Sequence, residues 1–228
     1  MRRIRLAVVE DHPLYLEGIL SRISRQPDLI EIVATGNSGE CLERILADET
    51  PDVILLDWVL PAKQDEHVRQ GKAKYSTVGA LERINQLENP PHILILSAET
   101  SAFTIQTALD LGADAYIVKD DVSSMDLGEF IVRVWRGEMC LSPEANKIVK
   151  EAYLLDPLES PTEAELELAS DILAYPGDKW FARALRLKKS YGTIKNQRTS
   201  LYRRLRVTNK ADAIRVLEEI GIEPTFRG

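Results

Sequence analysis

The chain has 228 residues, enough for one large domain or two small ones. Its hydrophobic fraction of 44% and charged fraction of 29% are those of an ordinary globular protein. No stretch approaches the roughly 18–20 apolar residues that a membrane span requires. The two cysteines, Cys41 and Cys140, show neither a disulfide framework nor a metal-ligand spacing, so we expect a protein of the reducing cytoplasm.

Charge is distributed unevenly along the chain. Residues 1–160 carry 16 basic and 27 acidic side chains, a balance of −11, whereas residues 161–228 carry 13 basic and 9 acidic ones, a balance of +4. Residues 179–210 contain eleven Lys or Arg and no Asp or Glu. This asymmetry predicts two domains, of which the second faces a polyanion.

Short apolar runs alternate with helical patterns over the first 138 residues. The expected strands are Ile4–Val9, Leu29–Ala34, Val53–Leu56, Ile93–Leu96 and Ala115–Val118. The expected helices are Leu14–Ser24, Ser38–Ala47, Leu81–Leu87, Phe103–Leu111 and Met125–Trp135, with Ser38 as an N-cap and Gly112 as a C-cap. Strands that are apolar throughout are buried on both faces. The pattern therefore predicts an α/β domain, a doubly wound five-stranded parallel sheet of the flavodoxin-like type.

The second part of the chain has a helical pattern. Gly137, Pro143, Pro157 and Pro161 punctuate this part of the chain, and we interpret residues 139–160 as a linker with a short helix at Glu144–Tyr153. After the linker the β pattern disappears. Four helices are expected, at Glu163–Ala174, Lys179–Leu185, Thr193–Arg204 and Ala211–Ile220, with Ser190 capping the third and Gly221 ending the last. We therefore expect a first domain at 1–138 and a small all-α domain at 161–228.

Polar residues follow four of the expected strands. Glu10 and Asp11 follow the first, Asp57 the third, Ser97 the fourth and Lys119 the fifth. Ligands of parallel α/β sheets bind at these carboxyl ends. Three carboxylates repel one another unless a cation intervenes, and hard oxygen ligands suit Mg²⁺. A carboxylate can also attack a phosphoryl group as a nucleophile. One acid alone at a strand end would more often be a helix cap or a solvated loop residue.

Residues 4–136 resemble a response-regulator receiver domain. The resemblance rests on Val8–His12, Pro51–Asp57, Leu94–Ala98 and Gly112–Lys119. It implies that Asp57 is the phosphoacceptor, that Ser97 and Lys119 bind phosphoryl oxygens, and that no separate substrate is turned over.

The resemblance also implies a metal site and a switch. Asp11, Asp57 and the backbone carbonyl of Val59 would bind Mg²⁺, with Glu10 acting directly or through water. Ser97 would move toward the phosphoryl group, and Tyr116 would rotate inward behind it.

Two features depart from the receiver pattern. Asp120 follows Lys119 where many receivers have proline, which leaves the isomer of that peptide bond open. The segment 61–77 after Asp57 is roughly ten residues longer than is typical, and long loops are often functional. We expect the extended loop 62–77 to be mobile, and gating of the site or recognition of a kinase are open alternatives.

Residues 161–221 resemble the LuxR-type helix-turn-helix of the NarL/FixJ regulators. The matching stretches are Ser160–Glu165, Asp178–Leu185, Ser190–Asn196, Arg203–Val207 and Asn209–Ala213. The third helix has an apolar stripe and a polar stripe, which suits a recognition helix in the major groove. The residues expected to contact DNA are Lys195, Asn196 and Thr199 at base edges, Lys189, Arg203 and Arg204 at phosphates, and Thr193.

These patterns predict a DNA-binding response regulator that a sensor histidine kinase phosphorylates on Asp57 with Mg²⁺, and that binds double-stranded DNA as a homodimer. One alternative is a phosphorylation-independent DNA-binding regulator whose receiver is a protein-interaction module. Another is an aspartate-dependent phosphohydrolase. Such enzymes typically carry a second acid two residues after the nucleophile, and position 59 is valine.

Overall fold

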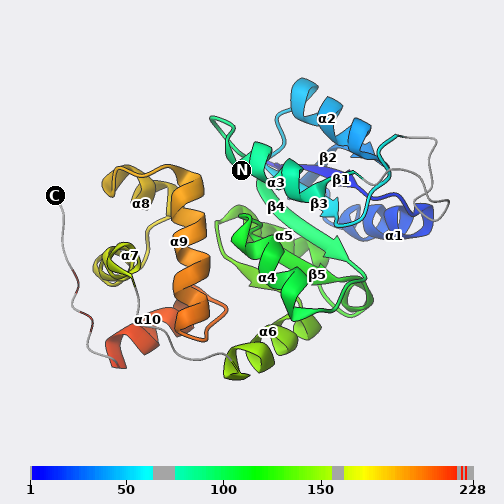
Figure 1. The fold of residues 1–228 in the computed structure, drawn as a ribbon. Helices are drawn as coiled ribbons and strands as arrows, with labels where there is room; N and C mark the ends of the chain where they lie inside the picture. The colour runs from blue at the N-terminus through cyan, green and yellow to red at the C-terminus, as the bar shows by residue number, and fades with distance from the viewer. Residues whose placement is uncertain (1, 64–74, 156–161, 220–221, 223, 225–228) are drawn as a thin grey trace.

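The structure is a computed structural model that describes residues 2–63, 75–155, 162–219, 222 and 224 (Figure 1). Six strands form one parallel sheet in the order β2-β1-β3-β4-β5-β6. Their bounds are β1 Ile4–Val9, β2 Ile30–Gly36, β3 Val53–Asp57, β4 His92–Ser97, β5 Ala115–Val118 and β6 Cys140–Leu141. The side chains of β3 are buried throughout, as expected for a central strand with helices on both faces.

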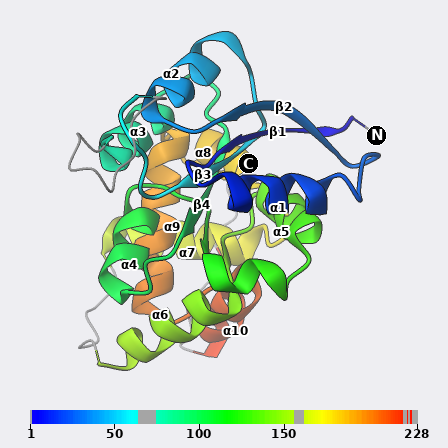
Figure 2. The same ribbon diagram turned by 90° about the vertical axis from the view of Figure 1, so that its right-hand side faces the viewer.

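Five helices cover the sheet, namely α1 Pro13–Ile23, α2 Gly39–Asp48, α3 Thr77–Asn85, α4 Ala102–Asp110 and α5 Leu127–Trp135 (Figure 2). The core on one face contains side chains of α1 and α5, and the core on the other face contains side chains of α2, α3 and α4. Ser38 caps α2 by accepting a hydrogen bond from the Cys41 amide at 3.3 Å, and Gly112 has a φ of 89° just after α4. The predicted doubly wound parallel fold is confirmed.

The sheet has one strand that the sequence did not predict. Gly137, at a φ of 85°, turns the chain after α5. The Cys140 amide then donates to the Asp114 carbonyl, and the Ser142 amide donates to the Tyr116 carbonyl, each at 3.0 Å. A strand of two residues is too short to show a periodicity, so the segment had the appearance of a linker.

Helix α6 (Pro143–Leu155) also packs on the sheet domain rather than standing free between two domains. Ala145 and Val149 are buried in the core that contains α4. The Tyr153 hydroxyl donates to the Gln106 side-chain oxygen of α4 at 3.3 Å. Residues 140–155, which we expected to be linker, therefore pack on the sheet domain. Helix α6 is also longer at both ends than the predicted helix Glu144–Tyr153.

Four helices follow, namely α7 Glu163–Ala174, α8 Trp180–Arg186, α9 Tyr191–Arg204 and α10 Lys210–Glu219. Thr162 and Glu165 form a reciprocal capping box at the start of α7. Ser190 caps α9 by accepting from the Thr193 amide at 3.0 Å, as predicted. Gly221 and residues 64–74 of the extended loop lie outside the described residues. The Lys119–Asp120 peptide bond is trans.

The two aromatic residues at the start of α8, Trp180 and Phe181, have different environments. Trp180 is buried, with the guanidinium groups of Arg183 and Arg198 at 5.3 and 5.1 Å from its ring and Tyr202 edge-on at 6.3 Å. Its neighbour Phe181 is exposed. Trp180 therefore belongs to the core of the helical domain, where its ring stacks against two cations. Within the described residues, no helix is long and apolar enough to cross a membrane.

A buried ion pair fastens α7 to α8. Arg183, fully buried, donates to the Asp171 carboxylate at 2.6 Å, and Arg186 donates to the same carboxylate at 2.7 Å. We expect Asp171→Ala to lower the free energy of unfolding of the helical domain by about 3 kcal/mol, because it leaves a buried guanidinium without its counterion. Urea unfolding followed by circular dichroism measures this change.

Asp178→Ala is the matched control. Asp178 also pairs with Arg186 but is more exposed, so its removal should cost less than about 1 kcal/mol. Equal destabilisation by the two variants would contradict the special importance of the Asp171 pair.

Candidate functional site

Three carboxylates meet where β1 and β3 end. One oxygen from each of Glu10, Asp11 and Asp57 lies within 4.8 Å of the others. Glu10 is fully buried and Asp57 nearly so. Burial and the nearby charge of Asp57 raise the pKa of Glu10 to about 7, and the same two causes raise the pKa of Asp11. The site therefore holds more negative charge than its own cations neutralise.

Lys119 is the cation that the site contains. Its Nζ lies 2.8 Å from Asp57 Oδ2 and 2.9 Å from Glu10 Oε1. Burial alone would lower the pKa of Lys119, but the two carboxylates outweigh it and raise the pKa above its usual value. Sequence reasoning expected Lys119, Asp57 and Glu10 at neighbouring strand ends, and the structure brings them into direct contact.

The acidic cluster fits a divalent cation. Glu10 Oε2 is buried and has no hydrogen-bond partner, which is costly unless a further positive group pairs with it. The donors are all hard oxygens, the ligands that Mg²⁺ prefers. Val59, expected to contribute its carbonyl, lines the same cavity, and its amide donates to Asp57 Oδ1 at 3.0 Å.

Ser97, the last residue of β4, and Tyr116, the second residue of β5, both form a hydrogen bond with the backbone of Glu99. The Ser97 hydroxyl oxygen accepts from the Glu99 amide at 3.0 Å, and the Tyr116 hydroxyl donates to the Glu99 carbonyl at 2.9 Å. Tyr116 is fully buried, and this burial raises the pKa of its hydroxyl. Tyr116 is therefore buried in this structure, and the inward rotation expected of it on phosphorylation stays a prediction.

A cavity of about 600 Å³ opens over Asp57. Asp11, Ser97 and Lys119 line it, as do two residues that sequence reasoning missed, His12 and Tyr15. Both come from the start of α1, which begins at Pro13 immediately after the acidic pair. Their position in the chain next to Asp11 was the available signal.

The second candidate site, on α9, faces the sheet domain. Figure 1 shows α9 as the C-terminal helix nearest to the sheet. Lys195 Nζ lies 2.8 Å from Asp114 Oδ2, and both side chains are fully buried. The Thr199 hydroxyl lies 3.4 Å from the Leu109 carbonyl and is also buried. Two of the residues expected at base edges are therefore covered by the first domain.

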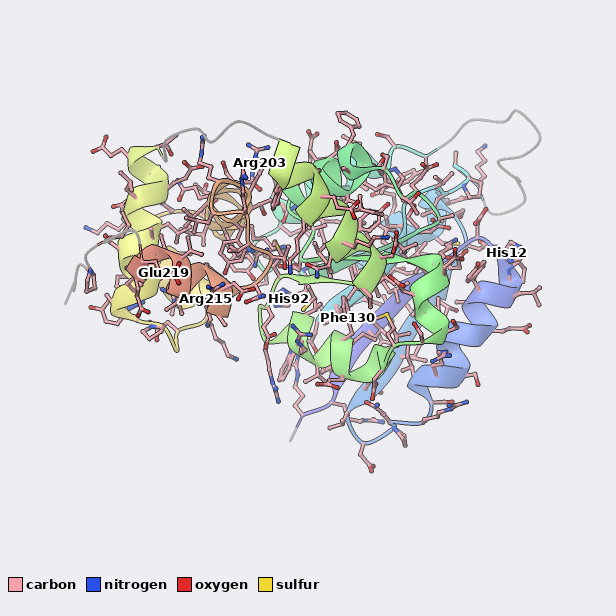
Figure 3. The ribbon with its side chains drawn as sticks, turned by 90° about the horizontal axis from the view of Figure 1, so that it is seen from below. His12, His92, Phe130, Arg203, Arg215 and Glu219 are labelled. Atoms are coloured by element: carbon pink, nitrogen blue, oxygen red, sulfur yellow. The ribbon has the colours of Figure 1, made fainter. Side chains whose placement is uncertain are left out.

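Asp114 gathers three cationic or potentially cationic groups. Besides Lys195, Arg198 Nη2 lies 3.5 Å from Asp114 Oδ1, and His92 Nδ1 lies 3.2 Å from Asp114 Oδ2. Burial by itself raises the pKa of Asp114, but Lys195, His92 and Arg198 hold it well below its usual value. Asp114 is therefore charged and is the counterion of the buried face of α9. Figure 3 labels His92 where the helical domain meets the sheet domain.

The remaining residues expected to contact DNA are exposed, in contact with the sheet domain, or paired within the helical domain. Thr193 and Asn196 are exposed. Arg203 reaches Asp110 of α4 at 3.5 Å (Figure 3). Lys189 pairs with Glu167 at 2.6 Å, and Arg204 pairs with Glu165 at 2.9 Å. These last two pairs are internal to the helical domain.

Comparisons with known proteins identify the family. The family described as response regulator receiver domain matches residues 6–127, so the chain belongs to the response regulators. The expected NarL/FixJ type is confirmed by its relatives. The chain is 27% identical over 212 residues to the nitrate/nitrite response regulator protein homolog of Haemophilus influenzae, which covers 92% of this chain and 94% of the relative.

Two further proteins are similar over most of the chain. A probable transcriptional regulatory protein NarL of Mycobacterium tuberculosis is 24% identical, over 93% of this chain and 92% of the relative. The fold resembles that of RcsB from Salmonella enterica serovar Typhimurium bound to a promoter in the presence of the phosphomimetic BeF₃⁻. That likeness has a TM-score of 0.55 at 17% identity and covers 96% of this chain and all of the other.

Removing the charge of Asp114 should separate the two domains. Asp114→Asn leaves the buried Lys195 and Arg198 without a counterion, and exposing them to water costs less than burying them unpaired. We expect a larger radius of gyration in small-angle X-ray scattering. Asp110→Asn, which removes only a half-exposed partner of Arg203, should leave the radius unchanged. An unchanged radius in Asp114→Asn would contradict this account of the interface.

Proposed function

We propose that this response regulator accepts a phosphoryl group on Asp57 from a sensor histidine kinase and then controls transcription by binding operator DNA as a homodimer. The observation that supports this proposal best is the contact of Lys119 Nζ with Asp57 at 2.8 Å, inside a cluster of three carboxylates. It leaves a nucleophilic carboxylate beside a fixed positive charge and a cavity that can admit a phosphoryl group.

The chemistry follows from these groups. An oxygen of Asp57 attacks phosphorus, and the bond from phosphorus to the kinase histidine breaks, with its electron pair returning to the imidazole nitrogen. A Mg²⁺ held by Asp11, Asp57 and Val59, with Glu10 beside them, would neutralise charge on the transferring group. Lys119 offers an ammonium and Ser97 a hydroxyl to the phosphoryl oxygens. The contact of Lys119 with the phosphoryl group requires it to change its present pairing with Asp57.

The resting arrangement supports a role for phosphorylation in release of α9. Lys195 and Thr199 cannot contact DNA while the sheet domain buries them. Asp114 and Lys119 lie at the two ends of β5, so a displacement of β5 by the phosphoryl group would reach the contact with α9. Free α9 could then enter a major groove, and two copies would bind a two-fold operator.

One observation favours the phosphorylation-independent alternative. Tyr116 is already fully buried, so its burial in this structure does not depend on a phosphoryl group at Asp57. In that case a partner protein on the sheet domain would free α9. The two proposals differ in whether acetyl phosphate raises the affinity of the full-length protein for its operator.

The acceptor is tested by labelling with a small phosphoryl donor. We expect acetyl phosphate and Mg²⁺ to phosphorylate the wild type, and Asp57→Asn to show no labelling, because the amide nitrogen is not a comparable nucleophile. A phosphate-affinity gel measures the phosphorylated fraction. Asp120→Asn, an exposed carboxylate near the site, is the control and should label normally. If Asp57→Asn labelled as strongly as wild type, another residue would be the acceptor.

The roles of two α9 residues are separable by affinity ratios. We expect Lys195→Ala to lower the preference for operator over unrelated DNA by about 1–3 kcal/mol, because it removes a base contact. Arg203→Ala should weaken all sequences alike and lower the salt slope by about one. Lys195→Ala also removes the ion pair with Asp114 and so helps to free α9, but this raises the affinity for every DNA sequence equally. The ratio of operator affinity to affinity for scrambled DNA therefore reports the base contact alone. Fluorescence anisotropy with operator and scrambled DNA measures both, and equal ratios in the two variants would contradict these roles.

A further inference from the structure

An aromatic residue covers Lys119 of the acidic site. Tyr15, in the first turn of α1, places its ring centroid 4.9 Å from Lys119 Nζ. The ring of His12 meets it edge-on at 5.5 Å with an interplanar angle of 78°. Both residues line the cavity over Asp57. Figure 3 labels His12 on the side of the molecule far from the helical domain, so this feature is separate from the contact between domains.

The position of the Lys119 ammonium has three determinants. Two are the carboxylates of Asp57 and Glu10, and the third is the face of the Tyr15 ring, which attracts a cation through its quadrupole. Lys119 is only 10% exposed, so this attraction acts in a partly desolvated place, where it is stronger than at an open surface. A phosphoryl group on Asp57 would change the first determinant and leave the ring in place.

The ring also stands between the cavity and solvent. Tyr15 is 37% exposed, so one part of its ring contacts water while another lines the cavity. Hydrolysis of an acyl phosphate needs a water molecule at phosphorus. The water oxygen bonds to phosphorus, the bond from phosphorus to Asp57 breaks with its electrons returning to the carboxylate, and the water proton passes to solvent. An apolar ring at the mouth hinders the approach of that water.

We propose that Tyr15 is a positioning residue that sets the lifetime of the phosphorylated state, by holding Lys119 against the phosphoryl group and excluding water from the cavity over Asp57. This inference rests on Asp57 as the acceptor. The hydroxyl of Tyr15 has no part in it, because both effects belong to the ring.

The test uses full-length variants phosphorylated with acetyl phosphate and then freed of donor. Tyr15→Ala should shorten the half-life of the phosphorylated form about fivefold, the effect of losing a contact of about 1 kcal/mol. Tyr15→Phe keeps the ring and should retain the wild-type half-life. Tyr15→Leu keeps apolar bulk without a π face and should fall between them. A phosphate-affinity gel followed over time measures all three.

Leu14→Ala is the matched control, because Leu14 is 72% exposed on the same turn and does not line the cavity. Its half-life should equal that of wild type. Wild type that fails to label overturns the proposed function itself. Wild type that labels, with an unchanged half-life in Tyr15→Ala, overturns only the role of Tyr15. If the phosphorylated forms of Tyr15→Leu and Tyr15→Phe had equal half-lives, apolar bulk alone would be enough, and the contact between the ring and Lys119 would not contribute.

Discussion

Strand β5 is the constraint on which both sites depend. Asp114 precedes its first residue and Lys119 follows its last, so one short strand separates the counterion of α9 from the cation of the acidic site. At about 3.3 Å per residue the two ends are roughly 16 Å apart. All four residues of β5 are buried, and the strand pairs with both β4 and β6. Strand β4 repeats the arrangement, with His92 at one end and Ser97 at the other.

The electrostatic balance at Asp114 explains why α9 is held so closely. Burying a charge is expensive unless it is paired, and Lys195 and Arg198 are both fully buried. Asp114 compensates them only while the domains touch. In water, or against the phosphates of DNA, the same cations would have other partners. DNA offers the same kind of negative oxygen as Asp114, so under the proposed function Asp114 and DNA would compete for this face of α9.

The sequence predicted the sheet and the acidic site well, because both depend on local patterns. Apolar runs reveal buried strands, and Glu10, Asp57 and Lys119 stand at strand ends where topology alone brings them together. Strand β6 has two residues and no periodicity to reveal it. The burial of Lys195 and Thr199 depends on contacts with another domain. The sequence pattern of a basic stripe on a helix does not reveal whether the partner of that stripe is Asp114 or DNA. Tyr15 showed no pattern, since a single aromatic in a first turn is common.

Under the proposed function, a phosphoryl group on Asp57 has to shift the equilibrium between closed and separated domains. Shifting an equilibrium from 1:99 to 99:1 needs about 5.5 kcal/mol of differential stabilisation. The charged part of the contact consists of one short ion pair, Lys195 with Asp114 at 2.8 Å, and longer ones such as Arg198 with Asp114 at 3.5 Å. Removing one partner of a buried ion pair destabilises a protein by about 3–5 kcal/mol. A displacement of Asp114 away from Lys195 would therefore remove much of the free energy that stabilises the closed arrangement of the domains. The contact also has an apolar part, since one buried cluster contains side chains of both domains, but its buried ion pairs gather at one end of β5.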